Sequence, residues 1–129
     1  MNILAIEDNE QNMYLLRFLL ERRGHCLVEA HDGPAGIAAI QAERPDLILL
    51  DIQLPQMDGY AVARLLRGNP ALDAVPIIAV TSYAMHSDRE KALAAGCDAY
   101  IEKPINPGSF VVEVETTAAA GRRKQDGTS

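Results

Sequence analysis

The chain of 129 residues has no tryptophan, two cysteines and no long hydrophobic run. Cys26 and Cys97 lack CxxC or Cys/His spacing, which excludes a typical zinc site or disulfide framework, and both are predicted to be buried as small apolar residues. No apolar stretch approaches the length of a membrane span, and no basic leader precedes the first apolar residues. We therefore expect a cytoplasmic protein with no membrane partner.

Positive charge is also scarce, because 12 Lys and Arg face 18 Asp and Glu and leave a formal net charge of -6. Binding to nucleic acid phosphates requires a basic face, so no direct nucleic acid partner is expected. A chain of this length is predicted to form one domain with a core of its own.

Short apolar runs alternate with segments of helical periodicity. The apolar runs predict strands over residues 2–6, 26–30, 47–50, 76–80 and 98–101, buried on both faces of a parallel sheet. The intervening segments predict helices that begin at Asn9 or Glu10 and end before Gly24, and that cover 35–43, 60–67, 87–95 and 107–120. This alternation indicates an α/β, doubly wound fold of three layers, with five helices over both faces of the sheet. The flavodoxin-like strand order 2-1-3-4-5 fits this length.

Local signals place some helix ends. Asp58 is a candidate N-cap for the third helix, and Ser87 for the fourth, which Gly96 would stop. The last helix contains several β-branched residues, which are poor helix formers, so packing must stabilise it. Residues 1–120 are predicted to form the domain, and residues 121–129, which include Arg122, a flexible, solvated tail.

Charged residues follow three of the predicted strands: Glu7 and Asp8 the first, Asp51 the third and Lys103 the fifth. Ligand sites in such sheets lie beyond the carboxyl ends of the strands, so these side chains are expected to converge. Two carboxylates about 4 Å apart repel each other by on the order of 4 kcal/mol at an effective dielectric of about 20. Protonation or wide separation would relieve the repulsion, and so would a hard divalent cation such as Mg²⁺.

Lys103 and two further residues near these strand ends can be interpreted from their positions. Lys103 is either a solvated surface lysine or a point charge for a phosphate oxygen, and the position before Pro104 favours the second. Thr81 is either a strand-end threonine or a hydroxyl donor to a phosphoryl group. Tyr100 is expected to be a half-buried aromatic residue with a solvated hydroxyl.

The joint occurrence of these residues resembles the receiver domains of response regulators in bacterial two-component signalling, over residues 1 to about 120. The residues that carry the resemblance are Glu7-Asp8, Asp51, Pro55-x-Met57-Asp58-Gly59, Thr81-Ser82, Tyr100 and Lys103-Pro104. The resemblance implies a phosphorylation-dependent signalling switch. Its phosphoryl donor would be a histidine kinase or a histidine phosphotransfer protein.

The resemblance also implies a metal site. Asp51 would be the phosphoacceptor, and Mg²⁺, with Mn²⁺ as a substitute, would be held by Glu7, Asp8, Asp51 and the main-chain carbonyl of Gln53. Lys103 would contact the phosphoryl group.

The remaining implied roles concern the switch. Thr81 and Tyr100 would form the switch pair, and the Lys103–Pro104 peptide bond would be cis. The face formed by the fourth helix, fifth strand and fifth helix would bind the downstream protein. Such a protein is a phosphoacceptor with intrinsic autophosphorylation and autodephosphorylation, and not an enzyme.

Among receiver domains, the segment from Glu7 to Met13 is similar to single-domain cell-cycle regulators of alphaproteobacteria and to receivers attached to hybrid kinases. The leading hypothesis is a stand-alone regulator or phosphorelay intermediate, and the alternative is a receiver domain excised from a larger response regulator or hybrid kinase. Gln53 and Tyr83, each two positions beyond a site residue, are predicted to flank the path of an attacking water and to slow hydrolysis of the phosphorylated form.

Three other classes of protein fit less well. An aspartyl phosphatase would need a second acid two residues after its nucleophile, where this chain has Gln53. A flavin- or nucleotide-binding module would need a glycine-rich loop after the first strand, where Glu7 and Asp8 would instead repel phosphate. A degenerate receiver would have lost Asp51 or Lys103, and both are present.

Overall fold

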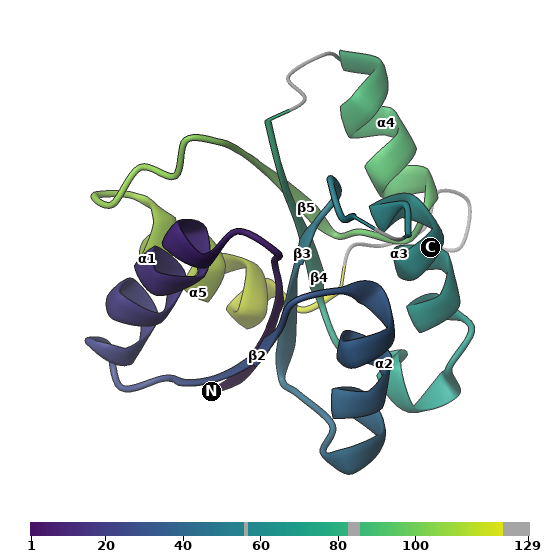
Figure 1. Ribbon diagram of the computed structural model, residues 1–129, viewed down its shortest axis with the longest axis horizontal. Coiled ribbons are helices and arrows are strands. Elements are labelled where there is room, and N and C mark those ends of the chain that lie inside the picture. Colours follow the sequence, from purple (N-terminus) through teal and green to yellow (C-terminus); the bar gives the residue numbers. More distant parts are fainter. Residues whose placement is uncertain (56, 83–85, 123–129) are drawn as a thin grey trace.

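The structure is a computed structural model that describes residues 1–55, 57–82 and 86–122. Within these residues, five parallel strands form one sheet in the order β2-β1-β3-β4-β5, which confirms the predicted flavodoxin-like order (Figure 1). The strands are β1 (Asn2–Ile6), β2 (Cys26–Ala30), β3 (Leu47–Asp51), β4 (Ile77–Thr81) and β5 (Ala99–Glu102). The helices are α1 (Glu10–Glu21), α2 (Gly33–Ala42), α3 (Gly59–Arg67), α4 (His86–Ala94) and α5 (Phe110–Ala120), with a short 3₁₀ helix, η1 (Pro70–Leu72).

The predicted three layers are confirmed, because α1 and α5 cover one face of the sheet and α2, α3 and α4 cover the other (Figure 1). Successive strand residues point to opposite faces. In β1, Ile3 and Ala5 pack with α1 and α5, whereas Leu4 and Ile6 pack with the helices of the opposite layer. The inner strands β3 and β4 are therefore buried along their whole length and apolar up to their last residues, Asp51 and Thr81, which explains the hydrophobic runs in the sequence.

Helix α2 begins two residues earlier than predicted, at Gly33 instead of Ala35. The carboxylate of Asp32 caps this helix by accepting a hydrogen bond of 2.8 Å from the backbone N–H of Ala35. Pro34 is tolerated because the first turn of a helix needs no N–H at that position. The sequence His31-Asp32-Gly33 is thus the entrance to this helix.

Helix α5 begins later than predicted, at Phe110 instead of Pro107. The side chain of Asn106 accepts a hydrogen bond of 2.8 Å from the N–H of Gly108, and this local bond holds the segment in a turn.

The predicted N-cap of α4, Ser87, is wrong, since the helix starts one residue earlier, at His86. The predicted N-cap of α3, Asp58, is confirmed, because its side chain accepts a hydrogen bond from the backbone N–H of Tyr60.

Of the two cysteines, Cys97 is buried as predicted, whereas Cys26 is exposed. The prediction was wrong for Cys26 because this residue begins β2, an edge strand of the sheet.

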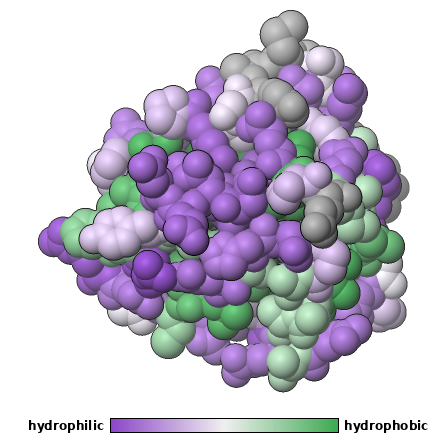
Figure 2. All heavy atoms as spheres, viewed as in Figure 1, coloured by the Kyte–Doolittle hydropathy of each residue, from purple (hydrophilic) through white to green (hydrophobic). Residues whose placement is uncertain are grey.

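Hydrophilic side chains gather over the middle of the face in Figure 2, and paler hydrophobic ones lie over the alanine-rich α2. Among the described residues, no helix is long and apolar enough to cross a membrane.

Candidate functional site

The carboxyl edge of the sheet brings together the charged residues that follow its strands. Glu7 and Asp8 come directly after β1, Asp51 is the last residue of β3, and Lys103 comes directly after β5. Carboxylate oxygens of the three acids all lie within 4.8 Å of one another. The ammonium nitrogen Nζ of Lys103 lies 3.0 Å from Oε1 of Glu7 and 3.2 Å from Oδ2 of Asp51. Residues as many as 96 positions apart, Glu7 and Lys103, therefore belong to one cluster.

The cluster is buried on one side and open on the other. Glu7 is 2% exposed and Asp51 is 3% exposed, whereas Asp8 is exposed to solvent. A small ligand can therefore approach past Asp8 and reach the two buried carboxylates. Three carboxylates and one ammonium group leave the cluster with excess negative charge when all four are ionised.

The surroundings of the cluster shift the pKa of Glu7 and the pKa of Lys103. Burial raises the pKa of Glu7, and its hydrogen bond with Asp51 raises it further. Burial by itself would lower the pKa of Lys103, but hydrogen bonds and attraction to Glu7 and Asp51 outweigh burial and raise this pKa. Lys103 therefore stays protonated, and the unbalanced negative charge falls on the acids.

Backbone contacts hold these side chains in place. The N–H of Lys103 donates to the carbonyl of Thr81 at 2.8 Å, and the Lys103–Pro104 peptide bond is cis, as the resemblance implied. The N–H of Gln53 donates to Oδ1 of Asp51 at 2.8 Å, so the turn after β3 wraps the carboxylate. The N–H of Asn9 donates to Oε2 of Glu7 at 3.1 Å. Each buried acid thus has a fixed orientation before any ligand arrives.

Gly59 allows α3 to start directly against the strand that carries Asp51. A Cβ atom at this position would lie 2.4 Å from Cα and 2.7 Å from the carbonyl oxygen of Ile52, both backbone atoms that cannot move aside. The N–H of Gly59 also donates to that carbonyl at 3.1 Å. This glycine is therefore required by the close approach of two backbones next to the site.

The donor set fits a hard divalent cation. Clustered carboxylate oxygens suit Mg²⁺ or Mn²⁺, whereas zinc and copper sites usually include imidazole or thiolate ligands. Glu7, Asp8 and Asp51 are in reach of one ion, and Gln53 lies on the same turn as Asp51. In the described part of the chain this is the sole group of three or more potential ligands that lie so close together.

Thr81 and Tyr100, the predicted switch residues, lie at the carboxyl end of β4 and in β5. Thr81 is fully buried. Tyr100 is half-buried, but its hydroxyl oxygen is buried and has no hydrogen-bond partner among the described residues, so the expectation of a solvated hydroxyl was wrong. Burial raises the pKa of Tyr100, and nearby Asp88 and Glu102 add to the shift. A buried hydroxyl without a partner favours a rearrangement that gives it one.

The side chain of Gln53 makes a contact that the sequence did not indicate. Its Oε1 accepts a hydrogen bond of 3.0 Å from the N–H of Ser82, which joins the loop after β3 to the loop after β4. The other residue predicted to flank the water path, Tyr83, lies outside the described residues.

A tyrosine also missed by the sequence analysis links two helices near the switch residues. The hydroxyl of Tyr60, in α3, donates to the carbonyl of Asp88, in α4, at 3.4 Å. Burial, followed by the charge of Asp88, raises the pKa of Tyr60 to about 12. Helical periodicity gave no signal for this contact, because it depends on how α3 and α4 pack.

Comparison with known proteins agrees with this geometry. The family described as "Response regulator receiver domain" matches residues 3–115. The polar-differentiation response regulator DivK of Brucella anthropi is 39% identical over 115 residues, which are 89% of this chain and 94% of DivK.

Two solved structures are similar and contain metal ions. The receiver domain of the sensor histidine kinase PA1611 from Pseudomonas aeruginosa PAO1, with magnesium in its active site cleft, is 32% identical, with a TM-score of 0.83 over 92% of this chain and 97% of that one. The Mn²⁺-bound form of the response regulator Rcp1 is 28% identical, with a TM-score of 0.76 over 89% of each chain.

Proposed function

Because the chain belongs to the family of response regulator receiver domains, we propose that it is a phosphorylation-dependent signalling switch with Asp51 as its phosphoacceptor. The observation that carries the proposal is the position of Asp51. Its carboxylate is buried at the end of β3, contacts Lys103, and lies within reach of the same cation as Glu7 and Asp8.

The proposed reaction transfers a phosphoryl group from a phosphohistidine of a histidine kinase or histidine phosphotransfer protein. One carboxylate oxygen of Asp51 forms a bond to phosphorus as the phosphorus–nitrogen bond breaks, and the donor histidine leaves with the electron pair. Such a transfer depends mainly on positioning and charge neutralisation. Lys103 places its ammonium group where it can hold a phosphoryl oxygen next to Asp51. The N–H of Gln53 already orients the carboxylate.

Mg²⁺, or Mn²⁺ in its place, would be held by Glu7, Asp8, Asp51 and the main-chain carbonyl of Gln53. A bound cation would offset the charge of the carboxylates and of the phosphoryl oxygens. The close set of carboxylate oxygens supports this assignment, and so does the metal in the related PA1611 and Rcp1 structures.

Phosphorylation would act as a switch through Thr81 and Tyr100. A phosphoryl group on Asp51 presents oxygens near the end of β4, and the Thr81 hydroxyl would donate to one of them. Movement of the loop after β4 would let Tyr100 turn inward and give its buried hydroxyl a hydrogen-bond partner. The new charge would thus bias a two-state element, formed by α4, β5 and α5.

The α4–β5–α5 face is our proposed surface for the downstream protein. A groove on this face, lined among others by Tyr100, Val112 and Thr116, runs between β5 and α5. Val112 is 55% exposed. We infer no direct nucleic acid partner, since the chain has a net charge of -6.

We further propose a cytoplasmic protein that acts as a stand-alone regulator or phosphorelay intermediate, because the DivK proteins it resembles are matched over nearly their whole length. Residues 1–120 would be the receiver domain and 121–129 a tail. The protein would be a phosphoacceptor and not an enzyme, with intrinsic autophosphorylation and slow autodephosphorylation. A receiver taken from a larger regulator or hybrid kinase is the alternative, which the full open reading frame would distinguish.

Intact-mass measurement with acetyl phosphate, with and without Mg²⁺, tests the phosphoacceptor. The expected result is a magnesium-dependent gain of one phosphoryl group that is absent in Asp51→Asn. Asp46→Asn makes the same change just before the start of β3 and should leave the mass gain intact. No gain in the unmodified chain with acetyl phosphate or a phosphohistidine donor would overturn the proposal.

A further inference from the structure

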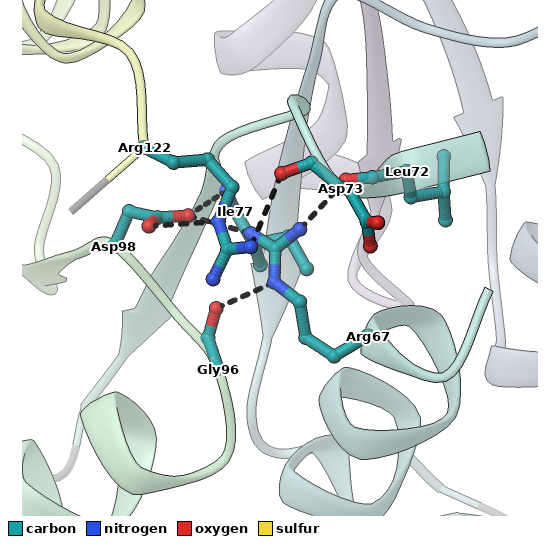
Figure 3. Close-up of polar contacts among 7 residues, drawn as sticks. All are labelled: Arg67, Leu72, Asp73, Ile77, Gly96, Asp98 and Arg122. Carbon is teal, nitrogen blue, oxygen red and sulfur yellow. Dashed lines mark hydrogen bonds and ion pairs between the residues drawn. The ribbon is translucent and has the colours of Figure 1, made fainter. Parts of the chain in front are cut away.

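A second cluster of charged side chains lies at the amino edge of the sheet, opposite the site. Figure 3 shows Arg67 at the end of α3, Asp98 just before β5, and Arg122 beyond α5 meeting there. The Asp98 side chain is 2% exposed, and its Oδ2 lies 2.6 Å from Nη2 of Arg67. Its Oδ1 lies 3.3 Å from Nε of Arg122. Arg122, predicted to be solvated, is instead bound to the domain.

The two arginines tie this cluster to several backbone segments. Nε of Arg67 donates to the carbonyl of Gly96 at 2.8 Å, and its Nη1 donates to the carbonyl of Leu72 at 2.9 Å. Nη1 of Arg122 donates to the carbonyl of Asp73 at 3.1 Å. A planar guanidinium can bind several acceptors at once, which a lysine cannot match in the same geometry.

Asp98 also fixes the start of β5 on β4. Its backbone N–H donates to the carbonyl of Ile77 at 2.7 Å, and its Oδ2 accepts from the N–H of Ile77 at 2.9 Å. These two bonds come immediately before the first paired residues of the two strands, Ile78 and Ala99. The carboxylate therefore helps to set the register of β5.

The same pair of bonds occurs at the start of β3. The backbone N–H of Asp46 donates to the carbonyl of Asn2 at 2.7 Å, and its Oδ2 accepts from the N–H of Asn2 at 2.7 Å. Asp46 and Asp51 are five positions apart, and so are Asp98 and Lys103. Each of these two strands is thus preceded by an aspartate that is bound to the neighbouring strand.

The two strands differ in how else they are held. Strand β3 lies between β1 and β4, whereas β5 lies at the edge of the sheet and pairs with β4 alone. Asp46 is exposed, and no arginine pairs with it within the described residues. The side chain of Asp98, by contrast, is buried between two arginines. The additional contacts occur on the strand that has only one neighbour.

We propose that Arg67 and Arg122 hold Asp98 so as to fix β5 along β4, and thereby position Lys103 at the phosphoryl site. This inference rests on the proposed function, in which Lys103 contacts the phosphoryl group. The four residues of β5 are all that separate Asp98 from Lys103. The N–H of Lys103 donates to the carbonyl of Thr81, the last residue of β4. A shift of Asp98 along β4 would therefore be carried to the lysine. Arg67, Asp98 and Arg122 are positioning residues, because none of them reaches the reacting atoms.

The structure separates this role from general stability. The proposed metal ligands come from the loop after β1, from β3 and from the loop after β3, whereas Lys103 directly follows β5. Loss of the amino-edge cluster should therefore weaken binding of a phosphoryl group without weakening Mg²⁺ binding, because displacement of Lys103 removes positive charge beside Glu7 and Asp51. A general loss of folded structure would weaken both.

Calorimetric titration of the full chain provides the test, first with Mg²⁺ alone and then with beryllofluoride, a phosphoryl analogue, in saturating Mg²⁺. Asp98→Asn keeps an acceptor for Ile77 but loses the charge that attracts the two arginines. A misplacement of this kind should weaken beryllofluoride binding by about tenfold. Arg122→Gln, at a partly exposed position, should produce a smaller loss in the same direction. Asp46→Asn is the matched control and should bind like the unmodified chain.

Each result bears on a different claim. Unchanged beryllofluoride binding in both Asp98→Asn and Arg122→Gln would overturn the positioning role, and so would a parallel loss of Mg²⁺ binding. Failure of the unmodified chain to bind beryllofluoride would overturn the proposed function, and this inference with it. A ¹⁹F resonance of bound beryllofluoride that shifts in Asp98→Asn, but not in Asp46→Asn, would support an altered contact with Lys103.

Discussion

Two buried charge clusters lie at opposite edges of one sheet, and their charge balance is opposite. At the carboxyl edge, the carboxylates of Glu7, Asp8 and Asp51 cluster together, and one cation of the described residues, Lys103, contacts two of them, Glu7 and Asp51. At the amino edge, one carboxylate, Asp98, is bound by two guanidinium groups and also accepts a backbone N–H.

The difference separates a site from a structural cluster. Buried charges are tolerated when they are paired and hydrogen-bonded, a condition that the Asp98 cluster meets from within the chain. The carboxyl-edge cluster does not meet it, since two buried acids, Glu7 and Asp51, must share one lysine. Unmatched negative charge of this kind is relieved by a cation, and it costs stability when no cation is bound.

The largest expected effect comes from breaking the amino-edge cluster with Arg67→Met. The variant removes three hydrogen bonds and leaves buried Asp98 with Arg122 as its remaining arginine. Removal of one partner from a buried ion pair typically costs about 3–5 kcal/mol of unfolding free energy, which urea denaturation would measure. Arg64→Met, at an exposed position of the same helix, is the control. A loss no greater than the control's would show that this cluster contributes no more than surface charges.

Mg²⁺ should act on the carboxyl-edge cluster alone. A ligand that binds the folded state at about one hundred times its Kd stabilises that state by about 2.7 kcal/mol. The melting temperature of the unmodified chain should therefore rise with added Mg²⁺. Asp8→Asn should reduce the rise, and Asp98→Asn should retain it. Equal rises in Asp8→Asn and the unmodified chain would exclude Asp8 as a ligand.

The pH dependence of stability should reveal the cost of the unmatched acids. Since folding raises the pKa of Glu7 above 4.5, its protonation favours the folded state, and this contribution is lost as the pH rises through the raised pKa. In a chelator, Glu7→Gln should thus be more stable than the unmodified chain at neutral pH, by a margin that shrinks toward pH 4.5. Urea denaturation across this range would measure it. A margin independent of pH would contradict the raised pKa.

The smallest effect is expected from an ion pair that neither cluster contains. Arg23 and Glu115 lie 2.8 Å apart, but their side chains are 53% and 29% exposed. Exposed pairs of this kind contribute about 0.2–1 kcal/mol, so Arg23→Gln should change the unfolding free energy by no more than about 1 kcal/mol. A loss as large as that of Arg67→Met, measured by the same urea denaturation, would show that burial does not decide the strength of these pairs.

The carboxyl-edge cluster could be located from sequence because each of its members lies within two positions of the end of an apolar run. Glu7, Asp51 and Lys103 needed no knowledge of tertiary packing beyond the strand order, since parallel strands end at one edge. The amino-edge cluster gave no such signal. Arg67 ends an amphipathic helix, and Arg122 lies in a basic segment beyond the last helix, so each resembled an ordinary surface charge.

Contacts between loops and between helices also escaped prediction. The bond between Gln53 and Ser82 and the bond between Tyr60 and Asp88 both join segments about thirty positions apart, and neither follows from a local pattern. The late start of α5 was missed for a different reason, since a single side-chain bond from Asn106 overrides the helical pattern around it.

The sequence by itself determined the α/β layers, the strand order and the charged edge of this protein, because hydrophobic periodicity and the geometry of parallel strands act locally and repeat along the chain. Tertiary structure alone decided which charges become partners. Asp46 and Asp98 make the same two backbone bonds, yet only Asp98 lies where α3, η1 and the end of α5 converge. The partners of a side chain depend on which distant segments pack around it, and no residue pattern near Asp98 specifies them.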